Sequence, residues 1–188
     1  MPKLWTATID EHRSAVLNAI LDATGELVRE NGMTGLSMTA LAAGAGVGRA
    51  TLYKYVPDTG AAIAAWQHRE MSRHLAELRT IAAESPPAVR LGKVLEAYAM
   101  IRHGRHGGGA TDGLHGADRL HPVETGVREL VASVIEEDVG AGRARMDIAA
   151  ADLAAYAVAA TGAAAILPDE GAGLRIARLV AETIESST

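Results

Sequence analysis

A glycine-rich stretch from Gly44 to Tyr55 is the first part of the sequence whose residue types and spacing could do chemistry. It reads GAGVGRATLYKY, with three glycines before a basic residue and a threonine. A phosphate-binding loop would continue with Gly-Lys-Ser/Thr, or would place a third glycine three residues after Gly46. Arg49 and Ala50 stand in those places, and the preceding residues have a helical period. The sequence therefore argues against a nucleotide-binding loop.

The same stretch fits two short helices joined by a tight turn. Ser37 is a good N-cap for a helix through Ala43, and a second helix is expected over Arg49–Tyr55. The turn needs a small residue where the helices cross and a glycine that tolerates positive φ. The residues expected to build it are Ala42, Gly46, Val47 and Leu52. Because they occur in the order that a helix-turn-helix requires, we favour this interpretation.

The exposed face of the second helix would present side chains suited to nucleic acid. Arg49, Ala50, Thr51 and Lys54 offer donors and a methyl group to base edges and phosphates. Hydroxyls and backbone N–H groups at the start of the first helix can bind a phosphate. The further candidates are Ser37, Thr39, Tyr53 and Tyr55. Tyr53 could instead be a core tyrosine, and Lys54 could simply be solvated.

The rest of the sequence predicts an all-helical protein in which this motif is set. Hydrophobic residues make up 48% of the 188 residues, and phenylalanine and cysteine are absent, which excludes disulfides and thiolate sites. The net charge is −5, but residues 31–57 contain no acidic residue. An acidic protein with one such window could touch a polyanion there. No stretch has the apolar length of a membrane span or the core of a signal peptide.

Helical periodicity and capping residues predict about nine helices and no convincing strand. Residues 1–9 are expected to be a flexible arm, and Asp147 is expected to cap an alanine-rich helix. The segment 103–121 is rich in glycine and histidine and is expected to be a loop. Its histidine spacing matches no standard metal site, and no catalytic grouping is evident. We therefore expect no metal, no cofactor and no enzymatic activity.

From about Ala15 to Ile63 the sequence resembles the DNA-binding domain of the tetracycline-repressor (TetR) family. The resemblance is carried by ENG at the end of the first helix, LSMTALAAGAGV across the turn and ATLYKY on the recognition helix. It implies a DNA-binding domain over residues 1–57 and an effector-binding and dimerisation domain over 58–188. It also implies phosphate contacts from Ser37, Thr39, Tyr53, Lys54 and Tyr55, and base contacts from Arg49, Ala50 and Thr51.

Three positions depart from the family pattern. Val56 replaces the usual phenylalanine, which would thin the packing beneath the recognition helix. Gly48 replaces a Ser/Thr cap, which is weaker by about a few tenths of a kcal/mol. Thr59 replaces a common lysine, so that one cationic phosphate contact is missing.

The remaining helices are expected to enclose a ligand cavity and to pair two subunits. The expected ligand contacts are Trp66, Tyr98, Arg102 and His103, although aromatic residues at helical spacing also occur in ordinary cores. Small residues at helical spacing would allow close contact with a second copy, or with other helices of the same chain. The expected dimerisation residues are Ala157, Ala160, Ala164 and Val180.

Together these features predict a homodimeric, cytoplasmic transcriptional repressor without a membrane partner. It would bind a palindromic operator in double-stranded DNA and be released by a small hydrophobic or aromatic effector. Two alternatives stay open. One is an activator of the same fold, and the other is a helical small-molecule-binding protein or enzyme with a vestigial DNA-binding domain.

Overall fold

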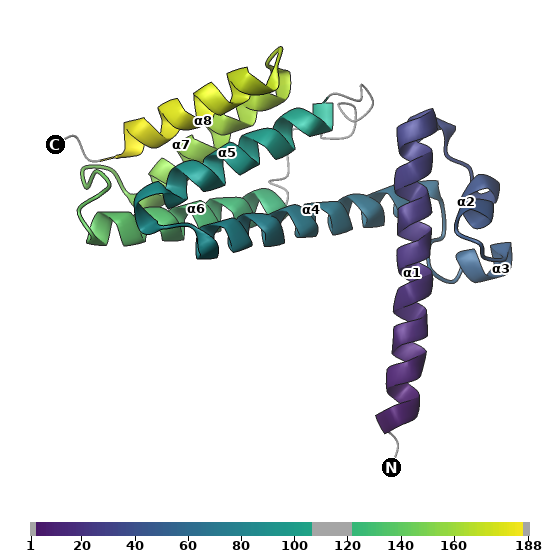
Figure 1. Ribbon diagram of the computed structural model, residues 1–188. Helices are drawn as coiled ribbons and strands as arrows, with labels where there is room; N and C mark the ends of the chain where they lie inside the picture. Colours follow the sequence, from purple (N-terminus) through teal and green to yellow (C-terminus); the bar gives the residue numbers. More distant parts are fainter. Residues whose placement is uncertain (1–2, 107–121, 186–188) are drawn as a thin grey trace. The chain divides into compact units, whose positions relative to one another are not determined.

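The computed structural model describes residues 3–106 and 122–185. The described residues form eight α-helices and two 3₁₀ helices and contain no strand, which confirms the all-α prediction. The α-helices are α1 Lys3–Asn31, α2 Met38–Gly44, α3 Arg49–Leu52, α4 Thr59–Glu84, α5 Pro87–His106, α6 Pro122–Gly140, α7 Ala150–Gly162 and α8 Glu170–Ile184 (Figure 1). The 3₁₀ helices are η1 Met33–Gly35 and η2 Ala163–Ile166.

The chain divides into two compact units, Met1–Glu70 and Met71–Thr188. We call them unit 1 and unit 2. The division falls within α4, so that this helix supplies its first turns to unit 1 and its last turns to unit 2. Most of the glycine- and histidine-rich segment, residues 107–121, lies outside the described residues.

Unit 1 has a small core formed by α1, α2, α3 and the start of α4. Ile20, Leu41 and Leu52 are fully buried in it. The first turns of α4 are also fixed to α1. The Arg69 side chain donates a hydrogen bond to the carboxylate of Asp22 at 2.7 Å and to the backbone carbonyl of Asn18 at 3.3 Å.

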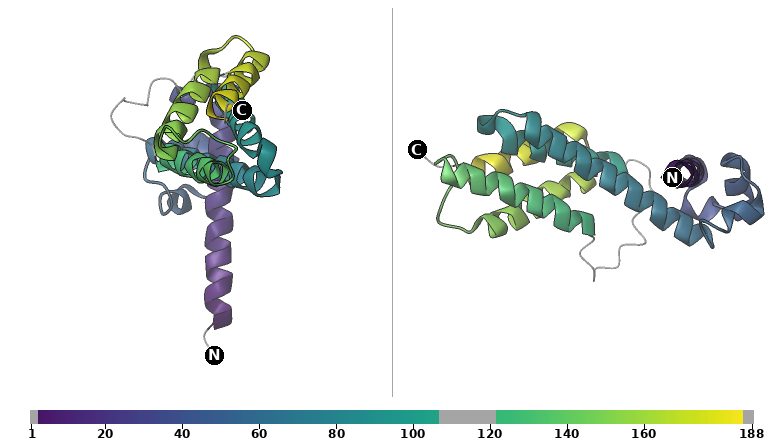
Figure 2. Two further views of the ribbon diagram at one scale, coloured as in Figure 1. Left: turned by 90° about the vertical axis from the view of Figure 1, so that its left-hand side faces the viewer. Right: turned by 90° about the horizontal axis from the view of Figure 1, so that it is seen from below.

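Unit 2 is a helical bundle in which α5 lies beside α8 and α6 lies beside α7 (Figures 1 and 2). Its core includes Val94 and Leu95 of α5 and Ile135 of α6, all fully buried. Glycines allow two close approaches between helices. A Cβ atom at Gly126 would lie 2.6 Å from Leu75, and one at Gly173 would lie 3.0 Å from the Cβ of Ala164.

Several local expectations differ from the structure. The helix α1 begins at Lys3, so that residues 3–9 are helical rather than a loose arm. The recognition helix α3 ends at Leu52 instead of Tyr55, because the chain continues in tighter turns. The N–H groups of Lys54 and Tyr55 bond the carbonyls of Thr51 and Leu52, three residues back.

Asp147 does not cap α7, which begins at Ala150 with Ala149 at its N-cap and no side-chain cap. Asp147 instead accepts two hydrogen bonds from Arg145, at 2.7 and 2.6 Å. The hydrogen bond from Arg145 lowers the pKa of the Asp147 carboxyl. This exposed ion pair lies in the connection between α6 and α7. The backbone N–H of Arg145 also donates a hydrogen bond to the carbonyl of Ile184 at the end of α8.

Candidate nucleic-acid interface

The turn between α2 and α3 has the geometry that the sequence predicts. Ser37 caps α2 by accepting a hydrogen bond from the N–H of Ala40 at 3.2 Å. The chain then reverses at Gly46, which has φ 64°. The N–H of Val47 bonds the carbonyl of Ala42 at 3.0 Å, which closes the turn. Since positive φ is costly for residues with a Cβ atom, glycine at this position fixes the angle at which α3 leaves.

The inner side of the motif is packed. Ala42 and Leu52 are 4% and 0% exposed, and Val47 packs against the same core. Val56, in the place where the family pattern expects phenylalanine, is 2% exposed. Gly48 is the N-cap of α3 and makes no side-chain cap hydrogen bond. The hydrogen bonds of Thr51 and Leu52 to its carbonyl therefore begin the helix without help from a side chain.

The outer side of the motif carries the residues expected to contact DNA. Ser37 and Thr39 are exposed at the start of α2, and Arg49, Ala50 and Lys54 are exposed on α3 and the turn after it. Tyr53 is 48% exposed, so its phenol is not in the core. Thr51 and Tyr55 are only partly exposed, and Tyr55 packs against the core of unit 1.

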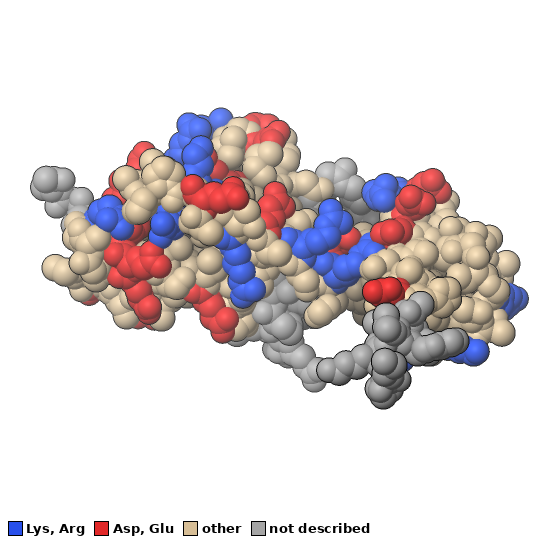
Figure 3. All heavy atoms as spheres, turned by 60° about the horizontal axis from the view of Figure 1, so that its bottom comes forward, with Lys and Arg blue, Asp and Glu red and all other residues tan. Residues whose placement is uncertain are grey.

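The positive charges of this surface are not neutralised by neighbours. Within the described part of the chain, neither Arg49 nor Lys54 forms an ion pair. No acidic residue occurs between Asn31 and Pro57. On the left-hand and middle parts of the face in Figure 3, acidic and basic side chains lie close to one another. Two free cations beside exposed hydroxyls and helix N-termini can hold DNA phosphates while α3 enters a major groove.

The residues expected to bind an effector do not form one group. Trp66 belongs to unit 1, where it packs with Val28, Leu36 and Ile63, and a Cβ atom at Gly25 would lie 2.6 Å from its Nε1. The indole is therefore partly buried against the core of unit 1, as expected for the ordinary packing role of an aromatic residue at helical spacing.

The other three expected ligand residues lie along α5 in unit 2. Tyr98 is 6% exposed and belongs to the core. The Nη1 atom of Arg102 lies 3.9 Å from the carboxylate of Glu124, and Nδ1 of His103 lies 3.4 Å from the backbone oxygen of Ala164.

The sequence reasoning missed Thr161, which is fully buried in α7. Its Oγ1 atom has no hydrogen-bond partner among the described residues. The sequence signal that could have identified it is a single threonine within an alanine-rich helix.

The residues expected to form a dimer contact lie in the interior of unit 2. Ala157 and Ala164 are 0% exposed and Val180 is 2% exposed, all within the core cluster. Ala160 is partly buried against the same cluster. Small residues of α7 therefore serve close packing within one chain, which is the alternative that the sequence left open. The exposed residues of α7 include Ala155, Tyr156 and Ala159.

A helix-turn-helix with an uncovered, unneutralised recognition face, followed by a helical bundle, defines a DNA-binding transcriptional regulator. Residues 20–58 match the family model of the bacterial regulatory proteins of the tetR family. Within this segment the chain is similar to the DNA-binding domain of the TetR family of transcriptional regulators. No curated protein matches the sequence.

Solved structures with the same fold include other transcriptional regulators. A TetR/AcrR-family regulator from Thermobifida fusca YX-ER1 is 18% identical, with 88% of this chain and 96% of that chain covered at a TM-score of 0.73. The regulator FadR from Bacillus subtilis, in complex with stearoyl-CoA, is 15% identical, with coverages of 90% and 98% and a TM-score of 0.65.

The ketosteroid transcriptional regulator KstR2 of Mycobacterium tuberculosis is 16% identical, with coverages of 91% and 95% and a TM-score of 0.61. At these identities the likeness establishes the shared fold. Among the described helices, none combines the length and the apolar character needed to cross a membrane.

Proposed function

We propose that this protein is a cytoplasmic, ligand-responsive repressor that binds a palindromic operator as a homodimer and is released by a small-molecule effector. The observation that carries the proposal is the recognition surface of unit 1. There α3 projects from a turn fixed by Gly46, and α3 and the turn after it present Arg49 and Lys54 without acidic partners among the described residues. The match of residues 20–58 to the TetR-family model supports the same role.

In this proposal α3 lies in the major groove with Arg49, Ala50 and Thr51 nearest the bases. Ser37, Thr39, Tyr53 and Lys54 bind the phosphates on either side. Tyr55, which packs partly against the core, contributes through its phenol oxygen. Two subunits would place their recognition helices about 34–36 Å apart, so that they reach successive major grooves of a palindrome.

The direct test is a binding titration of the full chain with DNA from the promoter region beside its own gene, at several salt concentrations. A specific complex whose affinity falls as salt rises supports the proposal. Lys54→Ala should weaken binding to all sequences alike and reduce the salt slope by about 1 per subunit. The matched control is Thr59→Ala, because Thr59 carries no positive charge and its replacement removes no cationic contact to a phosphate.

Absence of a specific complex both at that promoter and across the genome would refute operator binding. It would favour a helical binding protein or enzyme with a vestigial DNA-binding domain. A reporter gene in a deletion strain separates repression from activation, since loss of a repressor raises expression and loss of an activator lowers it.

We place the effector in unit 2, beside α5. Tyr98, Arg102 and His103 lie there within two turns, and the buried Thr161 hydroxyl on α7 has no hydrogen-bond partner in the described chain. The B. subtilis FadR complex with stearoyl-CoA and the ketosteroid regulator KstR2 support a hydrophobic effector for this fold. The effector must bind the DNA-incompetent state more tightly than the DNA-bound state, because equal affinity would release nothing.

We propose that the dimer forms through the outward faces of α7 and α8. Ala155 and Ala159 are exposed one turn apart on α7, beside Tyr156, which is 45% exposed. Leu179 on α8 is 56% exposed. Small residues beside large apolar ones permit close helix contact.

The dimer face is tested by sedimentation of the full chain and of Ala159→Arg. The wild type should sediment as a dimer and Ala159→Arg as a monomer. Ala83→Arg, at another exposed alanine, on α4, should remain a dimer. A dimeric Ala159→Arg protein would contradict this face.

A further inference from the structure

The recognition surface of unit 1 offers few kinds of side chain that can read a base pair. The stretch from Gly32 to Pro57, which supplies α2, the turn and α3, contains no Asn, Gln, Asp or Glu. In the major groove Asn and Gln pair with adenine, Asp and Glu accept from cytosine, and Arg and Lys donate to O6 and N7 of guanine. The hydroxyl groups of this surface bond donors and acceptors alike, so they select bases weakly. The side chains that remain as strong readers are those for guanine.

Two cations are available for that role, and they occupy opposite ends of the recognition helix. Arg49 is the first residue of α3, directly after its N-cap. Lys54 lies in the tighter turns after α3, where its N–H bonds the carbonyl of Thr51. In a helix-turn-helix the N-terminal residues of the recognition helix contact the base edges. Arg49 is therefore at the end that reads bases, and Lys54 is at the end that faces the DNA backbone.

The space in front of Arg49 is open. Cβ atoms at Gly46 and Gly48 would meet no atom within 4 Å, so no side chain covers the approach to the start of α3. Arg49 is exposed and forms neither an ion pair nor a side-chain hydrogen bond within the described part of the chain. All five N–H donors of its guanidinium are thus free. Their planar fork matches the two acceptors of guanine, whereas a lysine ammonium is a flexible point charge.

We propose, on the basis of the operator binding proposed above, that Arg49 reads one guanine in each half-site through hydrogen bonds to O6 and N7. Ala50 and Thr51 beside it offer methyl groups, which add contacts only with thymine methyls. Tyr53 and Lys54 bind the backbone and do not select a base. Base selectivity is therefore concentrated on one G·C pair in each half-site.

The test is selection of binding sequences from a random double-stranded DNA library with the full chain. The wild type should enrich a palindrome with a G·C pair at the same position of both half-sites. Arg49→Gln should enrich A·T there, because glutamine pairs with N6 and N7 of adenine, and Arg49→Ala should show no preference there. Replacing the guanine of one half-site should weaken wild-type binding about five- to 150-fold.

Lys54→Ala is the matched control, since it removes the other cation of the surface. It should bind more weakly but keep the preference for guanine. An even loss of affinity in Arg49→Ala, with every base preference kept, would show that Arg49 holds a phosphate and would overturn the proposal. Loss of the guanine preference in Lys54→Ala would overturn it too. Enrichment of no palindrome would refute operator binding itself, and this proposal with it.

A modified base isolates the contact. Replacing the selected guanine by 7-deazaguanine removes the N7 acceptor and leaves base pairing intact. Wild-type binding should weaken about tenfold, as expected when a charged donor loses one hydrogen bond. Arg49→Ala, shown to be folded by circular dichroism, should bind the modified and unmodified operators equally. Equal weakening of the wild type and Arg49→Ala would assign the guanine contact to another group and overturn the proposal.

Discussion

Replacement of Gly46 by alanine tests whether the turn geometry determines the stability of unit 1. Gly46 has φ 64°, and a Cβ atom there meets no atom within 4 Å. The substitution therefore causes no clash, and its cost is the backbone strain of a left-handed alanine, about 1–2 kcal/mol. We expect Gly46→Ala to lower the free energy of unfolding of unit 1 by that amount.

The assay is urea unfolding of the full chain followed by tryptophan fluorescence. Both tryptophans, Trp5 and Trp66, belong to unit 1, and Trp66 packs against its core. The signal therefore reports on unit 1. The slope of free energy against urea should remain unchanged while the midpoint falls.

The matched control is Gly48→Ser, two residues further on. Gly48 also has open space, but its φ is −69° and it occupies the N-cap of α3 without a side-chain hydrogen bond. Serine should supply that bond and raise stability by about a few tenths of a kcal/mol. An unchanged midpoint for Gly46→Ala, or a loss in Gly48→Ser as large as in Gly46→Ala, would refute the reasoning that positive φ alone requires glycine at the turn.

Three further predictions concern polar groups. Thr161→Val removes a buried hydroxyl that has no hydrogen-bond partner among the described residues, so it should raise the stability of unit 2 to thermal unfolding by about 1 kcal/mol. The same variant should respond more weakly to the effector in DNA-release assays. A loss of stability would indicate that the hydroxyl is hydrogen-bonded. Arg69→Ala breaks the contact of α4 with Asp22 on α1 and should lower the free energy of unfolding in urea by about 0.2–1 kcal/mol. Adding Asp22→Asn to Arg69→Ala should lower it no further, because the ion pair is already lost. The lowered pKa of Asp147 means that its ion pair with Arg145 stabilises the fold above the carboxyl's ordinary pKa and is lost as pH falls through the lowered value. The melting temperature of Asp147→Asn should therefore fall less steeply than that of the wild type as the pH is lowered below about pH 4. An equally steep fall would mean that other carboxyl groups cause it.

Local chemistry accounts for how well the DNA-binding motif is predicted from sequence. Ser37 accepts its cap bond three residues ahead, Asp58 accepts from the N–H of Ala61 at 2.7 Å, and Gly46 takes positive φ. Each of these features depends on residues within about one helical turn, so the residue types alone specify them. The same holds for the absence of acidic residues around Arg49 and Lys54.

The arrangement of unit 2 depends on contacts that are distant in sequence. Alanine is apolar on every side of α7, so periodicity does not distinguish the buried Ala157 from the exposed Ala159. Only the packing of α5, α6 and α8 against α7 selects the inner face. Likewise Trp66 could have faced either unit, and its contact with Gly25 follows from how α4 lies on α1.

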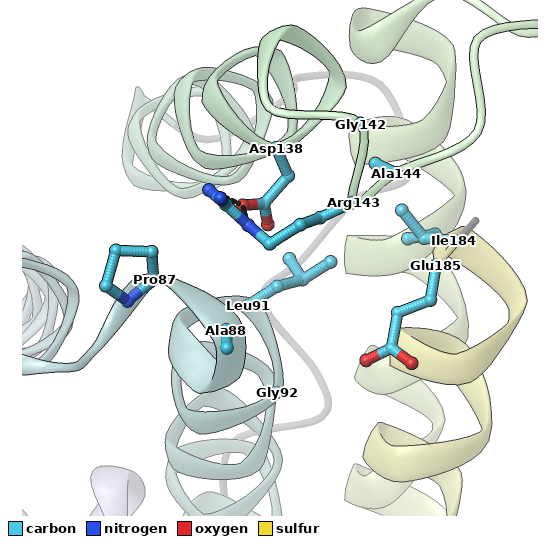
Figure 4. A pocket seen from close by; sticks show the side chains of 10 residues that line it. All are labelled: Pro87, Ala88, Leu91, Gly92, Asp138, Gly142, Arg143, Ala144, Ile184 and Glu185. Atoms are coloured by element: carbon cyan, nitrogen blue, oxygen red, sulfur yellow. Dashed lines mark hydrogen bonds and ion pairs between the residues drawn. The ribbon is translucent and has the colours of Figure 1, made fainter.

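A pocket beside Leu91 in unit 2 (Figure 4) also depends on contacts between segments that are distant in sequence. Its wall is built from the start of α5, the end of α6 and the end of α8. The sequence by itself determined an all-helical regulator with a recognition helix, because capping, turn geometry and charge are local properties. The tertiary structure decided which small residues are core, which are free for a partner, and where helix ends meet, because those depend on the docking of segments far apart in the chain.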